Sequence, residues 1–435
     1  MGNKKRKEKN HHKKQKRKAT GEQGLALSYV QDWVFRDSHP PPPSTAADAV
    51  NHDFLPQVAR KLADPVVFEL HSHSNRSDGF LAPAAVVERA HRNGVHVLAL
   101  TDHDTMAGIP EAIEAAQKYG IRIIPGVEIS AVYSPRLEPG TGEPVHILAY
   151  YGSSGPSRYE DLDNLLSNIR DGRYLRAKNM LLKLNKLKVP IKWEHLTKIT
   201  GDGVAPGRVH VARAMVEAGH VENLREAFNR YLHDGGPAYA VGTEPFAQDV
   251  VQLIHDTGGI AALAHPWALK NPVAVIRSLK AIGLHAMEVY RSDGKATGFG
   301  ELADTYELLK LGGSDYHGRG GHDESDLGSV NLPLATLYGF LKMARPVWCN
   351  AAKDILLNFA EDPYNTSLEK IMRFVIPRKS KGCTTVNSGK DIVDLCLSSW
   401  FSNDEKEDNE FEAIRFMLAD TEISKKVMQV PLSSR

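Results

Sequence analysis

Cysteine is scarce in this sequence. Only three cysteines occur among 435 residues, Cys349, Cys383 and Cys396, and all of them lie late in the chain. That number is too small for a disulfide framework, and the spacings between them match no common zinc motif. We therefore expect the protein to work in a reducing compartment.

Long apolar runs are also absent. No apolar stretch is long enough to cross a bilayer, and no hydrophobic region follows the basic start as it would in a secretory signal. Hydrophobic residues make up 42% of the chain and charged residues 25%, which is the usual balance of a soluble globular protein. The sequence therefore predicts no contact with a membrane.

Positive charge is concentrated at the start of the chain. The first eighteen residues contain ten Lys or Arg and one Glu, whereas the whole chain has a net charge of only +1. Such a block repels itself and has no apolar face, so we expect residues 1–64, which include the run Pro40–Pro43, to be a disordered tail and linker. The block is typical of a nuclear localisation signal or of an arm that contacts RNA, and a solubilising tail is the alternative. We expect a nuclear or cytoplasmic protein.

Short apolar runs alternate with helical patterns from Val66 onward. VVFEL, VHVLAL and IRIIPGVEIS are separated by segments with helical spacing such as PAAVVERAHRNG. This alternation predicts parallel strands joined by helical crossovers, and therefore an α/β fold. It is interrupted between about Gly152 and Phe246 and resumes with GGIAALAHP, HAMEVYRSD and LLKLGGSDYHG.

The change of pattern divides the chain into parts. We expect the first part of a barrel at 65–151, a helical cap insertion at 152–246 and the second part of the barrel at 247–345. The insertion is rich in Leu, Lys and Arg at helical spacing. Residues 346–435 are expected to form a C-terminal extension that is helical at first and partly disordered later.

Nearly every expected strand carries His, Asp or Glu at or near its C-terminal end. His71 and His73 follow VVFEL, and residues two apart in a strand point the same way. The others are Asp102, His103, Glu128, His265, Asp315 and His317 after later strands, Asp78 on the loop after the first strand, and His146, which begins its strand and which the pattern alone does not place. In a closed parallel barrel all strand C-termini open on one face, so we expect these side chains to converge there.

Divalent metal ions best explain six histidines and three carboxylates in one place. Buried without a metal, these groups would need other partners at considerable cost, whereas imidazole and carboxylate are natural metal ligands. A single histidine at a strand end is usually just hydrogen-bonded, so it is the joint pattern that favours metals. Nine ligands suit more than one ion, a carboxylate such as Glu128 can bridge two of them, and adjacent metals are the usual apparatus for hydrolysing phosphate esters.

The segments HSHS, TDHDT, GVEIS, HILAY, AHP and GSDYH resemble the successive motifs of the polymerase-and-histidinol-phosphatase (PHP) family of phosphoesterases, over about Val66 to Pro333. The resemblance implies a distorted seven-stranded β/α barrel, TIM-like, that holds three metal ions, with Mn²⁺ the first expectation and Fe or Zn also possible. It implies one ion on His71, His73, Glu128 and Asp315, a second on Glu128, His146 and His265, and a third on Asp78, His103 and His317.

The residue Asp78 and the helical insertion are similar to the branch of the family that acts on nucleotides. Members of that branch remove the 3′-phosphate of 3′,5′-bisphosphonucleosides or trim short RNA from the 5′ end. APGRVHVAR resembles the family's substrate-binding stretch, which makes Arg208 and His210 candidates for phosphate contact. Arg173 and Arg176 are weaker candidates, with a charged helical surface as the alternative.

The hypothesis for the reaction is attack on phosphorus by a metal-bound hydroxide. His103, Glu128 and His317 would act in it as ligands, and Asp102 would orient a ligand or the attacking water, or would only cap the turn after its strand. A cap over the barrel mouth favours a mononucleotide or a short oligonucleotide as substrate. A different phosphomonoesterase activity, such as that of a histidinol phosphatase, and an inert nucleic-acid-binding protein remain as alternatives.

Overall fold

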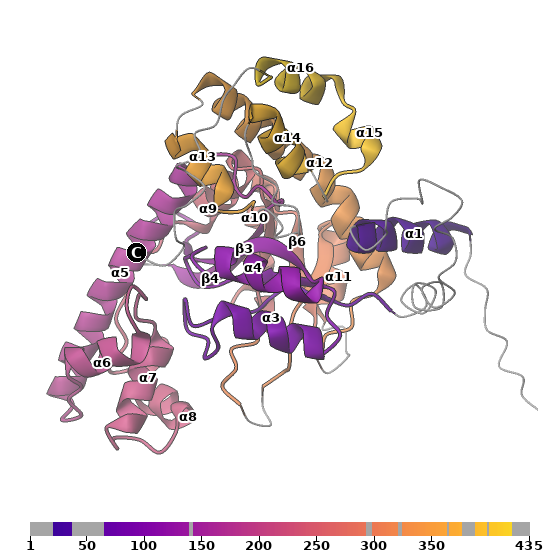
Figure 1. Ribbon diagram of the computed structural model, residues 1–435. Helices are drawn as coiled ribbons and strands as arrows, with labels where there is room; N and C mark the ends of the chain where they lie inside the picture. The colour runs from indigo at the N-terminus through magenta and orange to yellow at the C-terminus, as the bar shows by residue number, and fades with distance from the viewer. Residues whose placement is uncertain are drawn as a thin grey trace, which may run out of the picture.

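Figure 1 shows the computed structural model of the chain. The structure describes residues 21–36, 65–138, 142–292, 298–320, 324–362, 365–375, 388–397 and 400–419. The basic block at 1–18 and the proline run lie outside these ranges. Within them, no helix combines the length and the apolar character that a membrane span requires.

Seven strands follow one another around a nearly closed barrel in the order of the sequence. They are β1 (Phe68–Glu69), β2 (Val97–Leu100), β3 (Arg122–Tyr133), β4 (Glu143–Tyr150), β5 (Ile260–Leu263), β6 (Ala286–Tyr290) and β7 (Leu309–Gly312). The two ends of the sheet meet just beyond β1 and β7, where Ser72 pairs with Tyr316 and the amide of His73 donates to the Tyr316 carbonyl at 2.8 Å. The predicted α/β barrel is confirmed.

The strand β4 departs from the expected parallel arrangement. It runs antiparallel to both β3 and β5, whereas the other neighbouring strands are parallel. Only residues 134–142 separate β3 from β4, which is too short for a helical crossover but sufficient for a direct return. The expectation of an all-parallel barrel is therefore wrong for β4, and the N-terminal half of β4 lies beside the C-terminal ends of the parallel strands.

Crossover helices surround the barrel and bury its outer face. They are α3 (Pro83–Arg92), α4 (Ile109–Tyr119), α9 (Ala247–Asp256), α10 (Pro272–Ile282) and α11 (Phe299–Thr305). The helix α9 is representative, because Val250, Val251 and Ile254 recur at helical spacing and are completely buried. The strand β2 has no exposed residue, as expected for a parallel strand that is covered on both faces.

The cap consists of helices that lie within the expected insertion at 152–246. They are α5 (Tyr159–Lys186), α6 (Trp193–Thr200), α7 (Arg208–Glu217), α8 (Leu224–Ala227) and the π-helical turn η2 (Phe228–Leu232). The first half of α5 packs into the barrel core through Leu162 and Leu166, whereas Met180 and Leu184 in its second half belong to a separate core of the cap. A single long helix therefore joins the barrel to the cap (Figure 1).

A helix precedes the barrel where a linker was expected. The helix α1 (Gly21–Phe35) places Val30, Trp33 and Val34 on one face, and Trp33 is completely buried against Phe68 of β1. The expectation of a linker throughout residues 1–64 is therefore wrong for α1, because these apolar side chains pack into the same core as the barrel.

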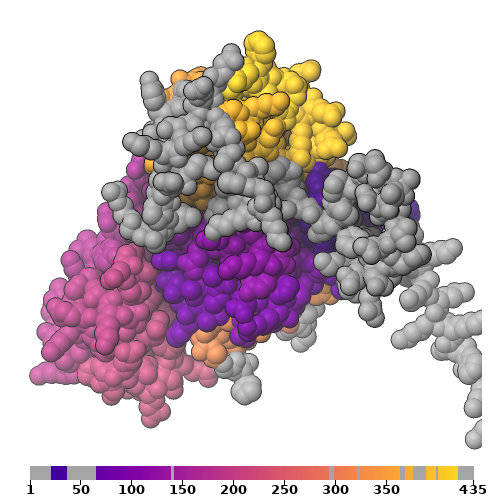
Figure 2. Space-filling view, in the orientation of Figure 1, coloured from indigo at the N-terminus to yellow at the C-terminus, as the bar shows by residue number. Residues whose placement is uncertain are grey.

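The C-terminal extension is continuous with the last part of the barrel. The helix α12 (Leu334–Glu361) passes through the expected boundary between residues 345 and 346 with Pro346 inside it, so that boundary is wrong. The helices α13 (Asn365–Met372), α14 (Gly389–Leu397), α15 (Asn403–Lys406) and α16 (Asn409–Met417) follow. Buried residues of α12, α14 and α16 belong to the barrel core, and Figure 2 shows these helices and the cap on different sides of the barrel. The later part of the extension was expected to be partly disordered, and residues 376–387, 398–399 and 420–435 lie outside the described residues.

Candidate active site

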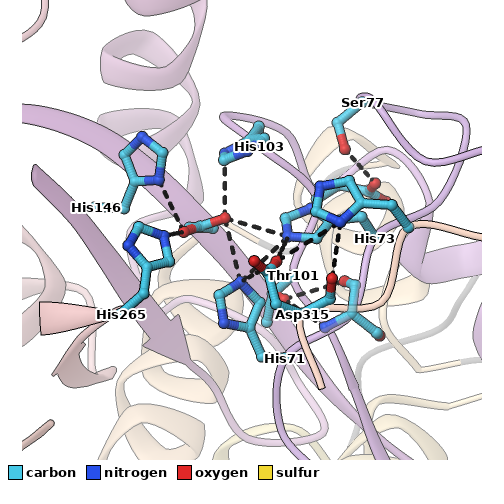
Figure 3. A network of polar contacts seen from close by, with 12 residues as sticks. His71, His73, Ser77, Thr101, His103, His146, His265 and Asp315 are labelled. Atoms are coloured by element: carbon cyan, nitrogen blue, oxygen red, sulfur yellow. Dashed lines mark hydrogen bonds and ion pairs between the residues drawn. The ribbon is translucent and has the colours of Figure 1, made fainter. Parts of the chain in front are cut away.

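The two histidines that follow β1 lie at the centre of a cluster at the barrel mouth (Figure 3). Both rings are completely buried, and their Nε2 atoms are 3.2 Å apart. Each Nε2 atom is also 3.2 Å from Oε2 of Glu128, a residue of β3. Asp315, after β7, places Oδ1 at 3.4 Å from the His71 Nε2 and 3.2 Å from the His73 Nε2. These four residues could hold one metal ion.

A second group lies around Asp78 on the loop after β1. The Asp78 Oδ1 atom is 3.3 Å from Nε2 of His317 and 3.9 Å from Nε2 of His103. The ring of His73 stacks on that of His317 with centroids 4.3 Å apart, and its Nδ1 atom is 4.0 Å from Asp78. The group of His73, Asp78, His103 and His317 could hold a metal ion.

A third group lies around the other side of Glu128. Its Oε1 atom is 2.9 Å from Nδ1 of His146 and 3.0 Å from Nε2 of His265, and its Oε2 atom is 3.2 Å from Nδ1 of His103. The family resemblance groups His146 and His265 with Glu128, whereas in the structure His103, Glu128 and His146 form the group that could hold a metal ion and His265 lies outside it. The antiparallel direction of β4 explains why His146, near the start of its strand, reaches the mouth.

The arrangement of donor atoms fits divalent metal ions. Imidazole nitrogens and carboxylate oxygens lie within 4.8 Å of one another in the first group, in the second group, and among His103, Glu128 and His146 of the third. Among the described residues, the Nδ1 atoms of His73 and His103 and the Oδ1 atom of Asp78 are buried and make no contact with hydrogen-bond geometry, although the His103 and Asp78 atoms lie 3.2 Å from Glu128 and 3.3 Å from His317. Buried polar atoms are almost always paired, so these atoms lack a partner that a cation would supply.

The electrostatics of the cluster favour the metal-binding protonation state at Glu128 and His103 but not at every ligand. Burial alone raises the pKa of Glu128, but His103 and His71 beside it hold that pKa well below its usual value. Burial lowers the pKa of His103 far below the usual range, against the opposing effect of Glu128. An ionised carboxylate and a neutral imidazole are the forms that coordinate a metal ion. Although burial alone lowers the pKa of His71 and of His265, the carboxylates beside these rings raise it above the usual value, so a metal ion would have to displace a proton from them.

The backbone is strained at three points around the mouth. Asp104, His265 and Asp315 have φ angles of 54°, 27° and 54°, in the left-handed region that residues other than glycine rarely occupy. Each such residue costs on the order of 1–3 kcal/mol, and strain of this kind concentrates at functional sites. Two of the three, His265 and Asp315, are candidate metal ligands. The strained backbone therefore occurs at residues whose side chains face the mouth.

Two buried carboxylates support the ligands and were not predicted from the sequence. Glu288 of β6 places Oε1 at 3.0 Å from Nδ1 of His71 and accepts a hydrogen bond from the His265 amide at 2.7 Å. Glu69 of β1 accepts hydrogen bonds from the amides of His71 and Ser314 at 3.1 and 2.9 Å. Such partners fix the orientation of metal ligands. The signal in the sequence is an acidic residue inside an otherwise apolar strand, in AMEVY and VVFEL.

Asp102 positions a loop rather than a ligand ring. Its carboxylate accepts hydrogen bonds from the Ser74 amide at 2.7 Å and from the Ser74 and Ser77 hydroxyls, both at 2.6 Å. These bonds hold the loop that carries Asp78. These contacts do not decide between the two roles expected for Asp102, and both stay predictions.

The four residues expected to bind substrate lie on the cap and its junction with the barrel. Arg173 is buried and pairs with Asp104 at 2.5 Å and with the Ser130 hydroxyl at 2.7 Å, so it ties α5 to the mouth. His210 is also buried, and its Nδ1 atom accepts a hydrogen bond from the Gly207 amide at 2.9 Å, which caps α7. Burial lowers the pKa of His210 to about 4, so the ring is neutral at physiological pH.

Arg176 and Arg208 each pair with a carboxylate through one nitrogen of the guanidinium group, and the other N–H donors of the group do not contact that carboxylate. Arg176 pairs with Glu244 through Nη1, and Arg208 pairs with Asp234 through Nη1 at 2.5 Å. A guanidinium group offers five N–H donors, and the Nε atom of Arg176 is buried without a partner. Burial and the nearby Arg173 and Arg208 lower the pKa of Arg176 despite Glu244. The three arginines therefore lie close enough for their positive charges to act on one another.

A barrel that gathers imidazoles and carboxylates in three groups at one mouth is the architecture of a metal-dependent phosphoesterase. Comparison with known proteins identifies the family. Residues 69–233 match the model of the PHP domain. A 5′-3′ exoribonuclease from Haemophilus influenzae is 35% identical over 257 residues, which are 58% of this chain and 89% of that protein. The chain belongs to the PHP family.

Two further proteins extend the comparison. A 3′,5′-nucleoside bisphosphate phosphatase from Chromobacterium violaceum is 31% identical over 289 residues, which are 64% of this chain and 94% of that protein. A solved structure from Bifidobacterium adolescentis, provisionally described as a metal-dependent phosphoesterase, has a TM-score of 0.55 and 28% identity and covers 64% of this chain and 96% of its own.

Proposed function

We propose that this chain hydrolyses phosphate esters of nucleotides, either the 3′-phosphate of a 3′,5′-bisphosphonucleoside or the 5′-terminal nucleotides of short RNA. The observation that supports this most strongly is the joint placement of the ligand groups and the arginines of the cap. The ligand groups suit the reacting phosphate, and the arginines suit a second phosphate of the same substrate. The activities for which the relatives from Haemophilus influenzae and Chromobacterium violaceum are named agree with both substrates.

We assign three divalent ions to the barrel mouth, with Mn²⁺ as the first expectation and Fe or Zn as alternatives. His71, His73, Glu128 and Asp315 would hold one ion, Asp78, His103 and His317 a second, and Glu128, His146 and His265 a third. When bound, such ions neutralise phosphoryl oxygens and lower the pKa of water. Glu128 links the groups, since five imidazole nitrogens lie within 3.2 Å of its two oxygens.

The protein's own side chains prepare the site in defined ways. Glu288 orients His71, and Asp102 holds the loop of Asp78. Arg173 fixes the cap over the mouth through Asp104, which limits the space for bulky substrates. Arg176 and Arg208 provide the positive charge for the phosphate that stays on the product, because their guanidinium groups present paired donors to an anion.

The experiment is an assay of the full chain with Mn²⁺, with products separated by chromatography. The substrates are adenosine 3′,5′-bisphosphate, a short 5′-phosphorylated RNA and histidinol phosphate. We expect turnover of a nucleotide substrate, its loss in His103→Ala, and normal turnover in His195→Ala, a surface histidine of the cap that pairs with Glu217. A preference for histidinol phosphate would contradict the role of the cap arginines. No turnover of any substrate by the metal-loaded protein would favour an inert binding protein.

A further inference from the structure

One segment of the cap, residues 173–198, carries unbalanced positive charge. Between residues 173 and 198 the sequence has eight Lys or Arg and one acidic residue, Glu194. Six lysines in this stretch are exposed: Lys178, Lys183, Lys186, Lys188, Lys192 and Lys198. None of the six has an acidic partner in the part of the chain that the structure describes. A surface of this kind attracts polyanions, and the attraction depends on salt.

The helix α5 connects this charge to the barrel mouth. Near its middle, Arg173 pairs with Asp104 at the mouth. Arg176 follows on the same helix. Lys183 and Lys186 come seven and ten residues after Arg176, which places these three side chains on one side of the helix. Since an α-helix rises 1.5 Å per residue, the thirteen residues from Arg173 to Lys186 span about 20 Å. Cations therefore extend outward from the mouth along one side of α5, the long helix that runs into the cap in Figure 1.

An aromatic ring lies among these cations. The Arg208 guanidinium is 5.7 Å from the centroid of the Tyr239 ring, and the Lys183 ammonium contacts the Tyr239 carbonyl oxygen. Tyr239 is only partly buried. Sites for single-stranded nucleic acid combine a cationic path for the backbone with aromatic rings on which bases stack. We call Arg176, Lys183, Lys186, Arg208 and Tyr239 the basic track.

We propose that the basic track binds the backbone of a single-stranded RNA whose 5′ end lies at the ligand groups of the mouth. This inference rests on the proposed function and narrows it, because it selects an oligonucleotide over a mononucleotide as the substrate. A 3′,5′-bisphosphonucleoside can reach the arginines near the mouth but not Lys183 and Lys186 at the far end of the track. Contacts of the track to phosphates predict binding that is largely independent of base sequence.

The test uses the full chain with Mn²⁺ and the variant Lys183→Gln/Lys186→Gln. For short 5′-phosphorylated RNA we expect KM to rise by about tenfold with kcat unchanged, since phosphate contacts act on binding. The slope of log affinity against log salt should fall by about 1.4 for two lost contacts to a single strand. Kinetics with adenosine 3′,5′-bisphosphate should not change. The basic block at 1–18 is present in every protein compared, so its contribution cancels.

The matched control is Lys118→Gln/Lys342→Gln, which removes two exposed charges from α4 and α12, outside the cap. An equal loss of RNA affinity in this control would mean that only the net charge of the protein matters. It would contradict the proposal that the basic track binds RNA. Unchanged RNA affinity in Lys183→Gln/Lys186→Gln would overturn it as well. Binding of labelled RNA to the metal-free proteins, followed by fluorescence anisotropy, tests the track separately. If the wild type hydrolyses no nucleotide, the proposed function is wrong. The comparison of RNA binding by the metal-free proteins still shows whether the basic track binds RNA.

Discussion

At the scale of single residues, Glu128 is the centre of the site. Its two carboxylate oxygens face imidazoles from β4 and from the segments after β1, β2 and β5. Only a cation or shared protons can stabilise such a group in a buried place. The surrounding residues divide into rings that face Glu128 and carboxylates such as Glu288 that hold those rings from behind.

The substitution Glu288→Gln tests whether Glu288 supports the candidate metal ligand His71. It keeps the shape of the side chain but removes the charge that lies 3.0 Å from Nδ1 of His71. Loss of a partner of this kind typically weakens metal binding by about 10–100-fold. Titration of the metal-stripped protein with Mn²⁺ by calorimetry measures the affinity. Glu301→Gln, at an exposed position of α11, is the control. Equal affinity in the two variants would show that Glu288 does not support the ligands.

His285 predicts a dependence of stability on pH. Its Nδ1 atom accepts a hydrogen bond from the Ala261 amide at 3.1 Å, and burial, with His255 and Lys280 nearby, lowers its pKa from 6.5 to about 4. The unfolded chain therefore takes up a proton between pH 6.5 and 4 that the folded chain does not, and stability falls as the pH falls through this range. His285→Asn, which keeps an acceptor, should reduce the fall in melting temperature between pH 6.5 and 4.5. An identical fall in variant and wild type would exclude His285 as a cause.

At the scale of elements, β4 shows what the sequence can and cannot reveal. The apolar pattern of VHILAY predicts a strand correctly, but no pattern within a strand tells its direction. That direction depends on the length of the connection from β3, and it decides whether His146 lies at the mouth or at the opposite end. Glu288 was missed for a related reason, since it lies within β6 and the sequence does not show which side of the strand faces the barrel interior.

The helix α1 shows a second limit. Its apolar residues have helical spacing, but they stand next to a basic and proline-rich segment that dominates the composition. Their role becomes visible only with their partners, which come from the other end of the chain. The Trp33 ring lies 6.4 Å from that of Trp348 and 5.1 Å from that of Trp400, and the Arg122 guanidinium is 4.7 Å from the Trp33 centroid.

Removal of the Trp33 side chain should therefore destabilise the whole protein. A buried Trp→Ala substitution costs roughly 3–5 kcal/mol, and Trp33 has no exposed surface. Thermal unfolding of Trp33→Ala should show a large decrease in melting temperature. Leu25→Ala on the same helix serves as the comparison, because Leu25 is 74% exposed. Similar small shifts in both variants would mean that α1 does not contribute to the core.

At the scale of the whole molecule, the alternation of strands and helices was sufficient to predict the barrel, whereas the first half of α5, which lies inside the expected cap insertion, packs into the barrel core. The convergence of distant residues followed from one rule of barrels, that strand ends open on a common face. The limits of the barrel were less predictable. The helix α12 begins as part of the barrel core and continues as the extension, so no change of composition marks a boundary near residue 345.

The sequence pattern alone also did not predict how the cap is connected to the barrel. DGRYLRAKNM presents Arg173 and Arg176 as neighbours on a charged helix. In the structure Arg173 pairs with Asp104 at the mouth and Arg176 pairs with Glu244, and the Nε atoms of both arginines are buried without a hydrogen-bond partner. Two arginines three residues apart therefore have different carboxylate partners, and only the folded environment shows which partner each one has.

The metal centre at the barrel mouth is tested most directly by anomalous diffraction from crystals of the full chain grown with Mn²⁺. The ligand groups predict anomalous density between His71, His73 and Asp315, between Asp78, His103 and His317, and beside His146, with Glu128 in contact with more than one ion. Manganese at other places, or an ordered mouth without anomalous density at saturating Mn²⁺, would contradict a metal-dependent site.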